Sequence, residues 1–148
     1  MSIIRDLFRH LDWANQTMLD TLRQQEVGGK PLILFSHLLH AERVWLARLE
    51  GTDSSRLAIW SDVEMSYCAE LMERNARDFA ALLDDPAASD PARVVAYANS
   101  RGTTFTNTVG DILTHVALHG QYHRGQINAR LREDGHNPVN VDYITFRR

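Results

Sequence analysis

Hydrophobic residues recur at the three- and four-residue spacing of amphipathic helices in four long segments of the chain. The first predicted helix runs from Ser2 to Gln25 and ends before the glycine pair at 28–29. The second begins at Pro31, which suits a first helical turn, and ends at Gly51. The apolar stripe of this second helix consists of Leu34, Leu38, Ala41, Trp45 and Leu49.

Capping signals indicate where the other two helices begin. Ser61 and Glu64 have the S-x-x-E spacing of a capping box, which predicts a third helix from there to about Leu83. Thr108 and Asp111 offer a similar cap for a fourth helix, and a glycine at 135 ends it.

The segments between these helices are short. Residues 94–97 and 103–106 are β-prone and flank a turn at 100–102, which predicts a small hairpin. The tail, 139–148, is expected to be extended and packed on the body. Four long amphipathic segments with short-to-moderate connections predict an all-α, up-down four-helix bundle with a short β-hairpin or extended segment before the last helix. We expect residues 1–148 to form a single domain of this kind.

Charge and composition narrow the classes of partner. The net charge is -3, so the chain lacks the excess of basic residues that is typical of a nucleic-acid-binding protein. No segment approaches the roughly 18 uncharged apolar residues of a membrane span, and the N-terminus carries charges where a signal peptide is apolar. We therefore predict a cytoplasmic protein without nucleic-acid or membrane partners. Cys68 is the single cysteine, so any metal must be bound through histidine, carboxylate or water.

Three histidines recur every four residues in the segment THVALHGQYHRGQ of the last predicted helix. Residues four apart lie one above the other, so two of these imidazoles can bind one metal ion. His115 and His123 lie roughly 12 Å apart along the axis and cannot both reach one ion easily. The apolar stripe contains His123 and has His119 at its edge. We therefore favour these two as ligands and interpret His115 as a surface residue or a support for the ligands.

The second helix offers a third imidazole. His37 lies near its apolar stripe, and facing helices of a bundle build sites together, so His37 can meet His119 and His123. Three neutral imidazoles with an open position are typical of a catalytic metal site. The alternative is that these histidines are surface or hydrogen-bonded core residues. Glu42 also approaches the stripe, where we expect it to pair with Arg43 or another surface cation, or to support the ligands.

Several motifs together cover nearly the whole chain. They are WAN at Trp13–Asn15, SHLLHAERVWLARLEG from Ser36, the hairpin region 97–102, HVALHGQYHRGQI from His115, and the tail pattern of Gly135, Pro138 and Asp142. On these motifs the sequence resembles the DinB-like family of metal-binding four-helix bundles, which also includes YfiT-like hydrolases. The resemblance implies metal ligands at His37, His119 and His123. One departure is Leu118, where relatives commonly carry Asn.

The resemblance also implies a chemistry. Three imidazoles without a thiolate suit zinc or nickel, with iron, manganese or copper as alternatives. Similar proteins include thiol S-transferases that use mycothiol or bacillithiol, which implies a metal that activates a low-molecular-weight thiol, or water, for attack on a small electrophile. No general base stands out, because Gly120 follows His119 where a zincin peptidase has Glu. Glu42, His115 and Tyr122 are the candidates.

Two other functions stay open at this point. A metal-dependent hydrolase would use the same histidines with water as the nucleophile. A non-catalytic, stress-associated metal-binding bundle would act as a homodimer, with helix faces left over from the core forming the interface. Activity toward an electrophile, measured with and without small thiols, separates an enzyme from a binding protein.

Overall fold

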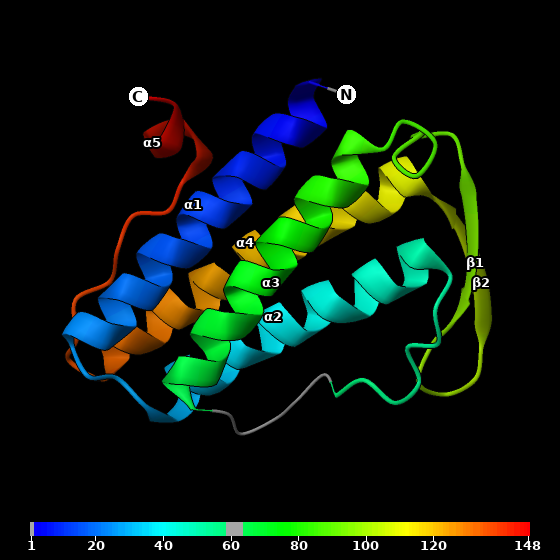
Figure 1. Ribbon diagram of the computed structural model, residues 1–148. Helices are drawn as coiled ribbons and strands as arrows, with labels where there is room; N and C mark the ends of the chain where they lie inside the picture. The colour runs from blue at the N-terminus through cyan, green and yellow to red at the C-terminus, as the bar shows by residue number, and fades with distance from the viewer. Residues whose placement is uncertain (1, 59–63) are drawn as a thin grey trace.

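The computed structural model describes residues 2–58 and 64–148 and contains the four long helices that the hydrophobic pattern predicts (Figure 1). These are α1 (Ser2–Gln24), α2 (Gly29–Glu50), α3 (Met65–Asp84) and α4 (Val109–Glu133). The predicted all-α bundle with a hairpin before the last long helix is confirmed. The hairpin pairs β1 (Val94–Ala98) antiparallel with β2 (Thr104–Thr108), and a short helix, α5, spans Tyr143–Arg147.

The order of the helices around the bundle brings α2 and α4 together. Each of α1 and α2 packs against both α3 and α4, and the contact between α2 and α4 is the most extensive. The starts of α1 and α4 lie at one end of the bundle, and the starts of α2 and α3 lie at the other (Figure 1). The helices therefore do not alternate in direction along the chain, because α2 and α3 run the same way, and the predicted up-down order is wrong. The spacing of apolar residues within a helix carries no information on the direction in which that helix runs. In the observed arrangement α2 and α4 pack antiparallel.

Most of the predicted helix ends are close to the observed ones. Gly51 ends α2 in a left-handed conformation with a φ of 73°, which a glycine adopts without strain. The capping box at the start of α4 is also present, since Thr108 and Asp111 each accept a hydrogen bond from the other's backbone N–H.

Two local predictions are wrong. Glu64 precedes α3 as its N-cap instead of lying in the first turn, so it does not complete the predicted capping box, whose Ser61 lies outside the described residues. The tail is not fully extended, because residues 143–147 form α5. Tyr143 and Phe146 are three residues apart, and this helix turns both rings toward His10 of α1.

The hydrophobic core consists of two clusters, one toward each end of the bundle. The cluster at the hairpin end includes one large side chain from each long helix, Phe8, Leu46, Phe79 and Ile112. The cluster at the opposite end likewise includes Met18, Leu38, Met72 and Ile127. Between the two clusters each long helix carries a buried residue that hydrogen-bonds to another helix: Asn15, Glu42, Asn75 and Arg124.

These four residues form a buried polar chain that links all four long helices. Arg124 Nη1 donates to Asn15 Oδ1 at 2.6 Å, and Asn15 Nδ2 donates to Glu42 Oε1 at 2.9 Å. Asn75 Nδ2 donates to the other Glu42 oxygen at 3.0 Å. Because the carboxylate and both amides are hydrogen-bonded, much of the cost of burying them is offset.

Glu42 is therefore not the partner of a surface cation, and that expectation is wrong. Arg43 instead pairs with Asp78 of α3, with a separation of 2.8 Å. Burial raises the pKa of Glu42 to about 7, against the opposing effect of its two amide hydrogen bonds. Burial also lowers the pKa of Arg124 to about 10, so its guanidinium stays charged at neutral pH.

A glycine makes room for the buried arginine. Gly120 lies one turn before Arg124 on α4, and a Cβ at this position would come within 3.0 Å of Arg124 Nη1. The absence of a side chain at Gly120 therefore lets the guanidinium lie back along its own helix and reach Asn15 of α1.

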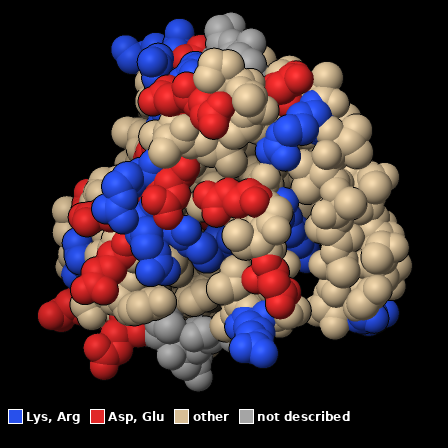
Figure 2. Space-filling model, turned by 45° about the vertical axis from the view of Figure 1, so that its right-hand side comes forward, with Lys and Arg blue, Asp and Glu red and all other residues tan. Residues whose placement is uncertain are grey.

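The surface carries charges of both signs. Figure 2 shows Lys and Arg interspersed with Asp and Glu over much of this face, whereas the right-hand part is nearly uncharged. The hairpin lies on that side in Figure 1, and its residues 94–108 include a single charged residue, Arg101. None of the helices in the described part of the chain is both long and apolar enough to cross a membrane.

Removing the buried guanidinium should destabilise the fold. Arg124→Leu leaves the Glu42 charge without its compensating cation and Asn15 Oδ1 without its donor. We expect a loss of about 3–5 kcal/mol in the free energy of unfolding, measured by urea denaturation followed by circular dichroism.

The matched control is Arg130→Leu on the same helix. Arg130 forms a largely exposed pair with Asp134 at 3.1 Å, and its loss should cost less than about 1 kcal/mol. Equal losses in the two variants would contradict a structural role for the buried polar chain.

Candidate metal centre

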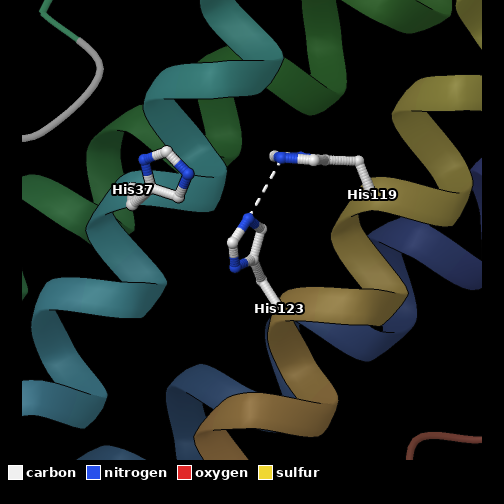
Figure 3. Close-up of side chains that lie close together, drawn as sticks. All are labelled: His37, His119 and His123. Carbon is white, nitrogen blue, oxygen red and sulfur yellow. Dashed lines mark hydrogen bonds between the residues drawn. The ribbon is translucent and has the colours of Figure 1, made fainter.

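Three histidines from two helices converge between α2 and α4. One ring nitrogen from each of His37, His119 and His123 lies within 4.8 Å of the others. Figure 3 shows His37 projecting from α2 toward the pair on α4. The ring centroids of His37 and His123 are 4.6 Å apart, and those of His119 and His123 are 4.4 Å apart. Such a group of nitrogens could hold a single divalent ion after small movements of the rings, since a zinc–nitrogen bond is about 2 Å long.

Helical periodicity explains how each side chain reaches this point. His119 and His123 are one turn apart on α4, so their rings lie on the same face. His37 lies among Leu34, Leu38 and Ala41, the buried stripe of α2. His37 and His123 are each 7% exposed. The extensive antiparallel packing of α2 on α4 therefore brings together the three histidines favoured by the sequence.

A glutamine fixes which nitrogen of His123 faces the group. His123 Nδ1 lies 2.7 Å from Gln126 Oε1, and an amide oxygen can only accept, so Nδ1 carries the proton. Gln126 Nε2 in turn donates to the hydroxyl of Tyr122 at 3.2 Å. In the neutral ring, Nε2 of His123 is then the nitrogen without a proton, and it lies 3.0 Å from Nε2 of His119. This is the tautomer of a metal-binding imidazole held by a neighbouring side chain.

The histidine cluster also favours neutral rings. Burial, followed by the nearby rings of His123, His115 and His37, lowers the pKa of His119 to about 4. At neutral pH the His119 imidazole is therefore uncharged, the form in which histidine binds a metal ion.

His115 lies beside the group of three and is not part of it. His115 is exposed, and its ring centroid lies 5.0 Å from that of Trp45, in an edge-on contact, and 5.3 Å from that of His119, in a tilted one. This agrees with the interpretation of His115 as a surface or supporting residue. Tyr122 is exposed on the other side of the group, with its ring 5.2 Å from that of His123.

Two other residues with reactive side chains, Glu42 and Cys68, are buried and are not part of the group of three histidines. Both oxygens of Glu42 are engaged by Asn15 and Asn75 in the buried polar chain. The Cys68 thiol is buried, which raises its pKa to about 11 and keeps it protonated. Sequence reasoning assigned no partner to Gln126 or Asn15, although both lie inside the motifs that carried the resemblance. For Gln126, a position three residues after a favoured ligand is the signal that could have identified it.

Comparisons with known proteins agree with this architecture. The model of the DinB family matches residues 2–148. Protein DinB of Bacillus subtilis (strain 168) is 28% identical, in an alignment that covers 93% of this chain and 89% of the relative. The uncharacterized protein YizA of the same organism is 21% identical, covering 89% of this chain and 83% of the relative.

Zinc binding should depend on each of the three converging histidines. His37→Ala, His119→Ala and His123→Ala each remove one of the nitrogens that lie within 4.8 Å of one another. We expect each variant to bind zinc more than about 100-fold more weakly than the unchanged protein, as measured by competition with a chromogenic chelator.

Two further variants make this test specific. His115→Ala removes a neighbouring ring of α4 and should leave zinc affinity nearly unchanged. Gln126→Leu removes the acceptor for His123 Nδ1 and should weaken binding about 10–100-fold. Zinc affinity that survives in His119→Ala would exclude this residue as a ligand.

Proposed function

Because the chain belongs to the DinB family and three of its imidazoles converge on one point, we propose that it is a metal-dependent thiol S-transferase. His37, His119 and His123 would hold a divalent ion, for which zinc and nickel are the best candidates. The substrates would be a low-molecular-weight thiol, such as mycothiol or bacillithiol, and a small electrophile. The reaction would take place in the cytoplasm, where small thiols are kept reduced.

The contact of His123 Nδ1 with Gln126, beside the convergence of the three ring nitrogens, is the observation that carries this proposal. A histidine that donates from Nδ1 to a neighbouring amide and turns Nε2 toward two other imidazoles is arranged for metal binding. When bound there, a divalent ion would supply Lewis acidity that activates a thiol or water as the nucleophile. A set of three protein ligands is typical of catalytic sites, because a structural zinc site uses four.

Two side chains beside the three histidines, those of His115 and Tyr122, could assist the reaction. In the proposed reaction the thiol loses its proton, its sulfur bonds to the electrophilic carbon, and the leaving group departs with the bonding electrons. His115 lies one turn before His119, with ring centroids 5.3 Å apart, so it is a candidate acceptor for that proton. Tyr122 flanks His123 on the other side and could hydrogen-bond the departing group.

A second function is supported by a different observation. Leu118 and Tyr122 lie four residues apart on α4 and are 62% and 64% exposed. An exposed apolar pair on one helix face favours contact with another chain, so the second candidate is a non-catalytic metal-binding homodimer. A metal-dependent hydrolase would differ from the first proposal only in using water as the nucleophile.

Turnover with a thiol and an aryl halide tests the proposed reaction. Zinc- or nickel-loaded protein should consume 1-chloro-2,4-dinitrobenzene faster when bacillithiol or mycothiol is present. His37→Ala, His119→Ala and His123→Ala should each lower kcat/KM at least about 100-fold, because each removes a proposed ligand. The rate is followed by absorbance of the aryl thioether.

The matched control is His40→Ala. His40 is three residues after His37 on α2, but its Nδ1 is hydrogen-bonded to the backbone oxygen of Ser36 and its ring stacks on that of Tyr67. This variant should retain full turnover. Metal binding without turnover across a panel of thiols and electrophiles would favour the homodimeric binding protein, and turnover that needs no thiol would favour the hydrolase.

A further inference from the structure

A cavity lies where the hairpin packs against α2 and α4. Its volume is ≈ 380 Å³, within the rough range of 300–1,000 Å³ that small-molecule sites occupy. It is lined by Trp45 of α2, Tyr97 and Asn107 of the hairpin, and Asp111, Ile112 and His115 of α4. The rings of Trp45, Tyr97 and His115 and the side chain of Ile112 share the lining with the polar groups of Asn107 and Asp111, so the pocket offers both ring contacts and hydrogen bonds to an organic molecule.

A series of ring contacts connects this hairpin pocket to the three histidines. His119 contacts His115 at 5.3 Å between centroids, and His115 contacts Trp45 at 5.0 Å. Trp45 in turn meets Tyr97 edge-on at 5.2 Å. His115 lines the pocket and precedes His119 by one helical turn, a rise of about 6 Å. A molecule in the pocket could thus extend a substituent toward the candidate metal centre.

The charges around the pocket favour a neutral occupant. The Arg48 guanidinium lies 4.4 Å from the ring centre of Trp45 and 4.8 Å from that of Tyr97, so a cation already uses these rings. A second cation would be repelled by Arg48, and an anion would meet the Asp111 carboxylate in the wall. The adjoining hairpin side of the surface is nearly uncharged (Figure 2).

One polar group of the pocket is oriented to donate. The Tyr97 hydroxyl donates to Asn107 Oδ1 at 2.7 Å, which identifies the amide oxygen and leaves Asn107 Nδ2 as the donor. Asn107 is exposed, so this amide can meet a ligand without rearrangement of the core. The occupant should therefore carry a hydrogen-bond acceptor.

We propose that the hairpin pocket binds the substrate's organic part, an uncharged aromatic group of one or two rings that bears a hydrogen-bond acceptor. Tyr97, Trp45 and His115 contact the ring, and Asn107 donates to the acceptor. Reaction of this substrate at the three histidines rests on the function proposed above, whereas binding in the pocket does not.

Acetophenone is a suitable probe because it is neutral, planar, carries a carbonyl and does not react with thiols. We expect it to shift the indole N–H signal of Trp45 and the side-chain amide signal of Asn107 in ¹H–¹⁵N spectra of the metal-free protein. Cyclohexyl methyl ketone, which keeps the carbonyl and lacks the planar ring, should bind roughly 5-fold more weakly or worse. Phenyltrimethylammonium should bind more weakly than acetophenone, and tighter binding of this cation would overturn the proposed charge preference.

Two variants locate the binding site. Tyr97→Leu should raise the Kd of acetophenone roughly 5–10-fold, because it removes one aromatic wall. Its control is Phe105→Leu, which makes the same change on the same hairpin at an exposed ring outside the pocket lining. Asn107→Ala changes an exposed side chain and should raise the Kd roughly 5-fold by removing the donor. Unchanged affinity in both Tyr97→Leu and Asn107→Ala, or no shift at Trp45, would overturn the proposal.

The outcome is separable from that of the proposed function. Acetophenone binding in protein that has no turnover would support the proposed binding in the hairpin pocket and contradict the proposed transferase activity. Thiol transfer to aryl halides without acetophenone binding at Trp45 would support the transferase and contradict the proposed binding in the hairpin pocket.

Discussion

The buried polar chain of Asn15, Glu42, Asn75 and Arg124 is the constraint on which the rest of the structure depends. Apolar side chains pack in many arrangements of similar energy, whereas a buried charge needs its partners at hydrogen-bond distance. Sliding or rotating any long helix would break at least one of these buried hydrogen bonds. We infer that these bonds select one register of the four helices from those that the two apolar clusters allow.

That register determines where the three histidines meet. Glu42 is five residues after His37 on α2, and Arg124 directly follows His123 on α4. The chain that joins Glu42 to Arg124 through Asn15 therefore fixes α2 relative to α4 within about one and a half turns of the candidate ligands. The apolar core contributes most of the stability, and the polar chain aligns the imidazoles. Gly120 contributes to the polar chain, because its missing side chain leaves room for the Arg124 guanidinium.

The sequence predicted the features that depend on local periodicity. Four helices, the hairpin, and the inward orientation of His37, His119 and His123 all follow from residue spacing within single segments. The partners of Glu42 could not be predicted in this way, since a carboxylate beside an arginine in the chain looks like one member of a surface pair. Its actual partners, Asn15 and Asn75, lie on other helices, and only the packing brings them together. The short helix α5 escaped prediction for the same reason, because its aromatic residues pack on His10 and Trp13 of α1.

The most direct measurement is extended X-ray absorption fine structure of zinc-loaded protein that carries no affinity tag. The convergence of His37, His119 and His123 predicts a first shell of nitrogen or oxygen at about 2.0 Å, with outer-shell scattering from three imidazoles. The His37→Ala protein, loaded with excess zinc, should show one imidazole fewer. Sulfur scattering, or a spectrum unchanged by the loss of His37, would contradict the assignment of these three residues from two helices to one metal centre.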